Sequence, residues 1–190
     1  MTVSVFLSYP APYSAKQKRF IARVEDYLKQ RGLSPRTLGV TDYDLSAPLT
    51  AIRRLMLESN GLITIAFRRT HVEKGISHTR RDDGILQEKP INNRWLTTPW
   101  AHIEPAMAYQ IGLPILIFRQ SGVLDDGILE RGVVGLYVPE FDLGEDLVED
   151  LQNDLVNKYF ESSQWIGVMS KWEGYVRATV ERKGNPPALF

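Results

Sequence analysis

The sequence contains no cysteine among its 190 residues. This absence excludes disulfide bonds, thiolate metal ligands and a cysteine nucleophile, and it agrees with the reducing conditions of the cytoplasm. Histidine is also scarce, and His71, His78 and His102 do not have the spacing of metal ligands. We therefore expect no metal site in this protein.

Long apolar runs, a leader segment and an excess of charge are missing as well. No apolar run approaches the roughly 20 residues of a membrane helix, and no signal region precedes the first apolar segment. Lysine plus arginine and aspartate plus glutamate both number 23, so the formal net charge is zero. The basic pair Arg80-Arg81 is too short to indicate nucleic-acid binding. We expect a cytoplasmic protein that binds neither nucleic acid nor membrane.

Apolar and amphipathic segments alternate along the first 143 residues. Short apolar runs predict strands, and a 3.6-residue apolar period, with Leu49, Ile52, Leu55 and Met56 inward in one segment, predicts helices. The expected strands are 3–9, 33–38, 62–67, 113–118 and 133–138, and the expected helices are 16–31, 48–60 and one that begins after Pro99. This alternation predicts an α/β domain with a parallel sheet covered on both faces. Ligands in such folds bind beyond the carboxyl ends of the strands.

Two regions depart from this alternation. The polar stretch 68–96 shows no clear periodicity, and we interpret it as a long loop that is functional, mobile or both. From Gly144 onward, two helical stripes predict an extension that packs on the sheet domain. Their residues are Leu147, Leu151, Leu155 and Tyr159, and then Trp165, Val168, Trp172 and Val176. We expect a domain over 1–143, a helical extension over 144–183 with its tryptophans in the core, and a flexible tail over 184–190.

Glu104 follows Trp100 by four residues in the segment that leads to the fourth strand. Pro99 and Pro105 both favour the first turn of a helix, which places Glu104 near a helix N-terminus, where free N–H groups and the helix dipole keep a carboxylate ionised. A fixed carboxylate beside an aromatic ring can stabilise the positive charge that develops on a sugar when an N-glycosidic bond breaks. The alternative is that Glu104 only stabilises its helix and Trp100 only packs.

Three stretches carry a resemblance to a known family: Val5-Phe6-Leu7-Ser8-Tyr9, the segment 51–67, and Trp100-Ala101-His102-Ile103-Glu104. Over residues 3–142 the chain resembles the Toll/interleukin-1 receptor (TIR) domains, specifically the bacterial members that cleave NAD+. Pro10, Pro105 and the long 68–96 stretch depart from the family pattern. The segment 104–108 and the following strand also resemble nucleoside deoxyribosyltransferases.

The resemblance implies a flavodoxin-like five-stranded parallel sheet and an NAD+ glycohydrolase or ADP-ribosyl cyclase, with Glu104 as the catalytic residue. NAD+ would be a substrate, and no cofactor is expected. The expected substrate-binding residues are Phe6, Ser8, Tyr9, Asp42, Arg68 and Trp100. For several of these a plainer interpretation stays open: Ser8 caps a turn, Asp42 and Asp44 belong to a solvated loop, and Arg68 and Arg69 are surface arginines rather than pyrophosphate ligands.

Three functions remain open at this point. The first is an NAD+-cleaving enzyme of anti-phage defence that forms homo-oligomers, contacts a neighbouring copy through Tyr43 in the 39–47 loop, and makes a product sensed by a partner effector. The second is an N-glycosyl enzyme of the deoxyribosyltransferase type, in which Glu104 is the covalent nucleophile. The third is a non-enzymatic adaptor or module that binds a nucleotide signal.

Overall fold

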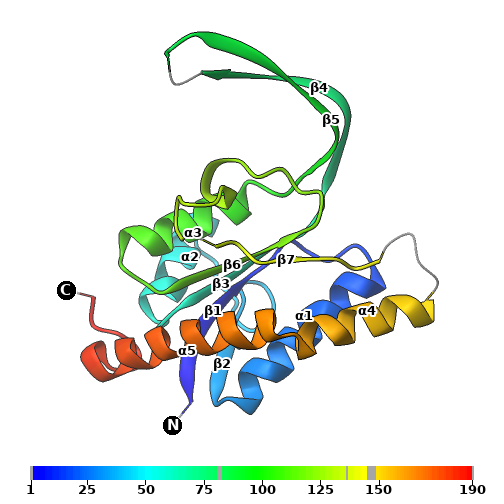
Figure 1. Cartoon of the computed structure of the whole chain (residues 1–190). Coiled ribbons are helices and arrows are strands. Elements are labelled where there is room, and N and C mark those ends of the chain that lie inside the picture. The colour runs from blue at the N-terminus through cyan, green and yellow to red at the C-terminus, as the bar shows by residue number, and fades with distance from the viewer. Residues whose placement is uncertain (1, 81–82, 136, 145–148, 190) are drawn as a thin grey trace.

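A five-stranded parallel sheet forms the centre of the protein (Figure 1). The computed structural model describes residues 2–80, 83–135, 137–144 and 149–189. The strands are β1 (Val3–Ser8), β2 (Leu33–Arg36), β3 (Leu62–Ala66), β6 (Ile115–Gln120) and β7 (Glu140–Phe141). They lie in the order β2-β1-β3-β6-β7, and every neighbouring pair is parallel. This is the flavodoxin-like strand order, and it confirms the predicted α/β fold class.

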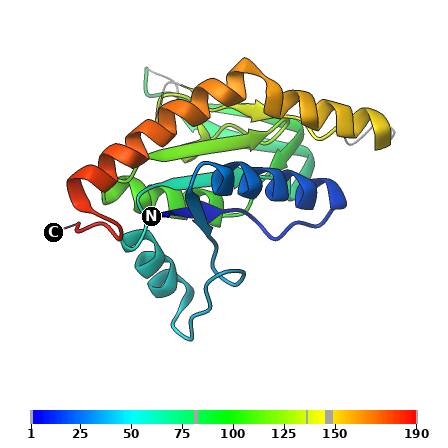
Figure 2. The same ribbon diagram turned by 90° about the horizontal axis from the view of Figure 1, so that it is seen from below.

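Helices cover both faces of the sheet (Figures 1 and 2). The helices α1 (Ala15–Gln30), α4 (Glu149–Glu161) and α5 (Ser163–Lys183) lie on one face, and α2 (Pro48–Leu57) and α3 (Trp100–Gln110) lie on the other. Side chains of β1 alternate between the two: Val5 and Leu7 join the first core and Phe6 joins the second. None of the helices in the described part of the chain has the length and apolar content that a membrane crossing requires.

The C-terminal helices α4 and α5 contribute buried side chains to the core on the α1 face of the sheet. Trp165, Trp172 and Val176 of α5 are buried in the core on the α1 face, which confirms their packing role. Tyr159 of α4 packs against the same core, and Leu147 lies outside the described residues. In α2 the prediction was wrong for one residue, because Leu49 is exposed in the first turn of the helix while Ile52, Leu55 and Met56 are buried.

The polar stretch 68–96 is not a loop. It forms a long antiparallel hairpin of β4 (Thr70–Arg80) and β5 (Leu86–Leu96) that projects from the domain (Figure 1). Most of its side chains are exposed, so the sequence lacks the alternation of apolar and polar residues that marks a half-buried strand. Among the hairpin residues whose side chains are described, those at its base join a core through Trp95, which packs near Ala101 and Val123.

Two predictions near the C-terminal half need correction. The fifth strand is Glu140–Phe141 rather than 133–138. Within the expected segment, Val133 lies in an exposed turn, whereas Val138 is buried. Residue 136 lies outside the described residues. The flexible tail expected from residue 184 does not fit Asn185. Its side chain accepts hydrogen bonds from the Ser4 N–H and the Asn60 amide and donates one to the Thr2 carbonyl.

Candidate functional site

Glu104 lies in the second turn of α3, with its side chain on the buried side of the helix. The helix begins at Trp100 with Pro99 as its N-terminal cap, and Pro105 lies inside the helix rather than in its first turn. Glu104 is therefore beyond the free N–H groups of the helix end. Only 9% of its surface is exposed. The Glu104 carboxyl group is therefore buried inside the helix face and does not face solvent at the helix end.

The hydroxyl of Ser8 donates a hydrogen bond to Oε2 of Glu104. Ser8 is the last residue of β1 and is itself buried. The two residues are 96 positions apart in the sequence and meet because α3 covers the carboxyl end of the sheet on this face. The Ser8 hydroxyl therefore bonds to the carboxyl group rather than to the turn that follows the strand.

Burial controls the charge of this carboxyl group. Removal from water raises the pKa of Glu104 to about 7, and the hydrogen bond from Ser8 partly opposes the rise. The prediction that the helix N-terminus keeps Glu104 ionised is wrong, because the side chain lies past the first turn and is desolvated. At neutral pH the carboxyl group is poised between its two protonation states, which suits a group that stabilises or transfers charge during a reaction.

A threonine that the sequence analysis did not select lies beside this pair. Thr64 of β3 is the register partner of Ser8, so both side chains lie on the same face of adjacent strands. Thr64 is fully buried, and its hydroxyl has no hydrogen-bond partner among the described residues. A buried hydroxyl without a partner carries a free-energy cost. The sequence held one signal for it, a polar residue inside the otherwise apolar run 62–67.

The two aromatic residues expected near Glu104 differ in accessibility. Trp100 is 41% exposed and lies one helical turn before Glu104, so it is on the same side of α3 and reachable from solvent. Phe6 is buried in the core between the sheet and α2 and α3, where it packs with Leu55 and Leu62. Trp100 can therefore contact a ligand, whereas the Phe6 side chain supports the site from within the core.

Tyr9 lies on the other face of the sheet from Ser8 and Glu104. It follows Ser8 directly, so its side chain points to the α1 face and packs against that core. There it lines a pocket of about 470 Å³ together with Thr37 and Gly39. Tyr9 therefore lies on the opposite face of the sheet from Ser8 and Glu104, as the alternation of side chains along a strand requires.

Neighbouring arginines hold the two aspartates of the 39–47 loop. Asp42 accepts hydrogen bonds from Arg36, and this contact lowers the pKa of its carboxyl group. Asp44 accepts hydrogen bonds from the Ser46 N–H and from Arg54 Nε at 3.0 Å, and these contacts lower its pKa to about 2. Asp42 is therefore part of a structural ion pair in this structure and is not directed toward Glu104.

Arg68 and Arg69 also have structural roles at the base of the hairpin. Arg68 Nε donates to the Ser121 carbonyl at 2.6 Å, and its guanidinium group lies over the Trp95 ring. Arg69 donates to the Ala11 carbonyl at 2.9 Å. The structure thus joins Ser8 to Glu104 by a hydrogen bond, with Trp100 one helical turn before Glu104 and Thr64 paired with Ser8. It places Tyr9, Asp42 and Arg68 in other contacts.

No protein-family model and no curated protein matches the chain. Solved structures resemble it with low identity, and three of them are described here. The CMP N-glycosidase BcmB of Clostridium botulinum is 15% identical, with 84% of this chain and 99% of that chain covered and a TM-score of 0.45. The TIR domains of the activated Roq1 resistosome are 10% identical, with 92% and 81% covered and a TM-score of 0.39. A conserved protein of Enterococcus faecalis V583 is 12% identical, with 84% and 99% covered and a TM-score of 0.39.

Proposed function

We propose that the protein cleaves the N-glycosidic bond of a nucleotide, with NAD+ as the substrate and Glu104 as the catalytic residue. The observation that supports this most is the buried hydrogen bond between Ser8 and Glu104 at the carboxyl end of β1. In parallel α/β sheets, ligands bind at this end of the strands, where the strand order reverses. In this sheet the reversal lies between β1 and β3, the strands that carry Ser8 and Thr64.

The chemistry requires one well-placed carboxylate. The nicotinamide nitrogen of NAD+ is cationic, so when the bond from ribose C1′ to that nitrogen breaks, the electron pair leaves with nicotinamide as a neutral group. Glu104 in its ionised form would stabilise the positive charge left on the ribose ring. Water adds at C1′ and loses a proton to give ADP-ribose, and attack by a nucleophile within the same molecule gives a cyclic product.

In this scheme the positive charge of the substrate and the negative charge of ionised Glu104 attract each other. A pyridinium cation near the Glu104 carboxyl group favours the ionised form and lowers the pKa from its value of about 7 in the free protein. Binding of NAD+ would therefore release a proton from part of the molecules at neutral pH. Trp100, half exposed on the same side of α3, is the proposed wall for the nicotinamide ring.

A second candidate follows from the raised pKa of Glu104. A neutral purine or pyrimidine base leaves poorly unless it gains a proton, and a carboxyl group that is partly protonated at pH 7 can supply one. An enzyme of the deoxyribosyltransferase type would instead use the ionised form of Glu104 as the nucleophile. In both of these reactions the same residues of the protein would act on a nucleoside or nucleotide whose base is not cationic.

Self-association is part of the proposal, because the 39–47 loop presents exposed apolar side chains. Tyr43 is 80% exposed, while the neighbouring Asp42 and Asp44 are held by arginines. We propose that Tyr43 contacts a second copy, that the assembly raises activity in anti-phage defence, and that a partner effector senses the product. Specific activity should rise with protein concentration and particle mass, and Y43A should reduce that rise. A constant activity from a monomer would contradict this part.

One set of incubations tests the reaction itself. The purified protein and its E104Q variant are incubated separately with NAD+, with CMP and with deoxynucleosides, and the products are separated by liquid chromatography. Release of nicotinamide by the parent protein and not by E104Q supports the first proposal, and release of free base from CMP or a deoxynucleoside supports the second. If neither product forms at any protein concentration, the protein is a binding module and the enzymatic proposal fails.

A further inference from the structure

Thr64 is a polar residue in the middle of an otherwise apolar strand. Its neighbours in β3 are Leu62, Ile63, Ile65 and Ala66, and every residue of the strand is fully buried. The Thr64 hydroxyl has no hydrogen-bond partner among the described residues. A valine would fill nearly the same space without the cost of a buried hydroxyl that lacks a partner. A threonine at this position therefore needs a reason other than packing.

Two observations place Thr64 beside the pair formed by Ser8 and Glu104. Thr64 is the register partner of Ser8 in the neighbouring strand, so both side chains lie on the face of the sheet that α3 covers. In addition, the first turn of α3 shares a core with Ala66, and its last turn shares a core with Leu62. Thr64 lies between these two residues on the same face of β3, and Glu104 lies between these two turns of α3. The Thr64 side chain is therefore next to the part of α3 that carries the carboxyl group.

A threonine hydroxyl can interact with either form of a carboxyl group. It can accept a hydrogen bond from the protonated form or donate one to the ionised form. Hydrogen bonds to an ionised group are roughly twice as strong as those between neutral groups, so a nearby hydroxyl favours ionisation. Ser8 already donates to Oε2 of Glu104, and Oε1 accepts no hydrogen bond from the described residues. Oε1 is therefore available to a second donor.

The charged groups around Glu104 do not account for its ionisation behaviour. Helix α3 packs against β3, β6, α2 and the short helix η1 (Gly127–Leu129). The other ionisable side chains on α3, on these elements or directly beside η1 are His102, Tyr109, Arg53, Arg54, Arg119, Asp126 and Glu130. None of these described groups contributes to the raised pKa of Glu104, which arises from burial and is opposed by the hydrogen bond from Ser8. Ser8 and Thr64 are therefore the polar groups that can influence this pKa.

We propose that the Thr64 hydroxyl donates a hydrogen bond to Oε1 of Glu104 when the carboxyl group ionises, so that Ser8 and Thr64 together hold the carboxylate. The two groups are not hydrogen-bonded in the structure, so the bond forms by rotation of one of the two side chains. The hydroxyl then lacks a partner only while Glu104 is protonated, and the bond stabilises the charged, reactive state selectively. Thr64 is a positioning residue that acts through Glu104. Its role in turnover rests on the proposed function, whereas its effect on ionisation does not.

Carbon-13 NMR of the glutamate side-chain carboxyl groups measures the ionisation of Glu104 directly. The E104Q spectrum identifies the Glu104 resonance, because that resonance is missing from it. We expect T64V to raise the pKa of Glu104 by about 0.5 to 1 pH unit, since one donor to the carboxylate is lost. T64S keeps the hydroxyl and should leave the pKa near the parent value. The variant T64A replaces T64V if circular dichroism shows that T64V does not fold.

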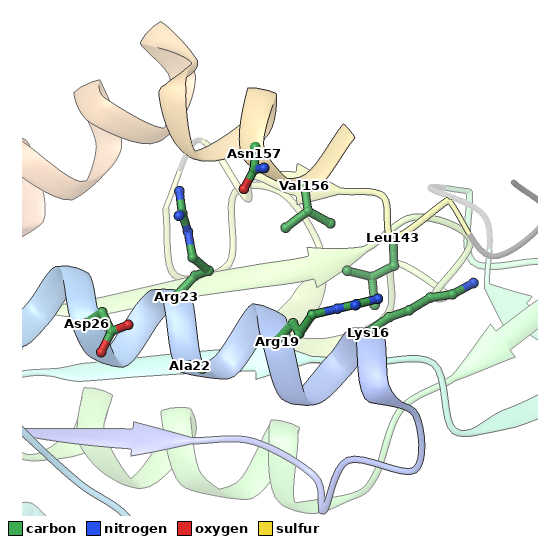
Figure 3. A pocket seen from close by; sticks show the side chains of 8 residues that line it. All are labelled: Lys16, Arg19, Ala22, Arg23, Asp26, Leu143, Val156 and Asn157. Atoms are coloured by element: carbon green, nitrogen blue, oxygen red, sulfur yellow. The ribbon is translucent and has the colours of Figure 1, made fainter. Parts of the chain in front are cut away.

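Two control variants separate this contact from general effects. T179V removes a buried hydroxyl that donates to the Tyr175 carbonyl within α5. R23Q removes a charge from the pocket between α1 and α4 that Figure 3 shows. Both residues lie across the sheet from α3, so neither variant should move the pKa of Glu104. A pKa in T64V that equals or falls below the parent value would overturn the inference, and so would an equal rise in T64S and T64V.

Turnover measurements distinguish this inference from the proposed function. With NAD+ as the substrate, the rising limb of kcat/KM against pH should move in T64V by as much as the pKa of Glu104. At a pH above both pKa values, kcat should fall by at least about tenfold with little change in KM, and T64S should restore it. A raised pKa in a protein that cleaves none of the tested substrates would support the Thr64 contact and contradict the proposed function. Cleavage by a T64V variant with an unmoved pKa or an unmoved limb would overturn this inference and leave the proposed function intact.

Discussion

The variant E104Q should be more stable than the parent protein at high pH and no more stable at low pH. Burial raises the pKa of the Glu104 carboxyl group in the folded protein to about 7, whereas an unfolded chain gives a glutamate an ordinary pKa of about 4.5. The folded protein therefore binds this proton more tightly than the unfolded chain. The contribution of Glu104 to the free energy of unfolding is therefore largest below about pH 4.5. It falls as the pH rises toward 7 and changes little above that.

The size of the effect follows from those two pKa values. Their difference of about 2.5, at about 1.4 kcal/mol for each pH unit, corresponds to a cost of about 3 kcal/mol for keeping Glu104 ionised at pH 8. A glutamine has the same shape, still accepts the hydrogen bond from Ser8, and avoids that cost. For a domain of this size, about 3 kcal/mol corresponds to roughly 6 to 12 °C in Tm.

The assay is urea unfolding of both proteins at pH 5, 6, 7 and 8. The free energy of unfolding of E104Q minus that of the parent should grow across this series. The contributions of the other titrating groups cancel in this difference, because both proteins contain those groups. The same variant should lose turnover by at least about 100-fold, since the charge acts in the transition state. A stability difference that is the same at every pH would refute the assignment of a buried carboxyl group with a raised pKa.

Four further predictions use the same structure. S8A removes the hydrogen bond to the Glu104 carboxyl group, so the rising limb of kcat/KM against pH, which the proposed function places near pH 7, should move to higher pH; an unmoved limb would contradict this. T64V removes a buried hydroxyl without a partner and should raise the free energy of unfolding by about 1 kcal/mol while turnover falls; unchanged turnover would exclude Thr64 from the site. W100A should cost less than about 2 kcal/mol of stability and weaken substrate binding, whereas W165A, in the core, should cost about 3 to 5 kcal/mol; equal losses in urea unfolding would count against a solvent-reachable Trp100. Replacing residues 78–88 of the exposed hairpin by an Asn-Gly turn should change unfolding by less than about 1 kcal/mol, and a large loss would reveal packing by the hairpin tip.

Local patterns were enough to predict most of the central fold. The apolar strands 3–9 and 62–67 and the amphipathic helix 16–31 appear within one or two residues of their expected bounds. Their patterns are readable because one or both faces of each segment are buried. The hairpin 70–96 was missed for the opposite reason: its side chains face solvent on both sides, so no apolar alternation marks it.

The candidate site was predictable only in its parts. The spacing of Trp100 and Glu104 identified α3 as the helix to examine, and the end of β1 identified Ser8. Asp42 was selected because it lies in an acidic loop, but Arg36, six residues earlier, holds it in an ion pair. A sequence pattern indicates which side chains have suitable chemistry, and it does not show which of them already have a partner.

Local sequence patterns predict the order of β1, α1, β2, α2, β3, α3 and β6 and a carboxyl group four residues after a tryptophan, because hydrophobic periodicity and residue spacing are local properties. The hydrogen-bond partner, the burial and the pKa of that carboxyl group depend on the tertiary structure. Packing of α3 over the sheet joined Glu104 to Ser8 across 96 residues and removed it from water. The pKa of about 7 is a consequence of that burial, and burial depends on which elements pack together rather than on the residues beside Glu104 in the chain.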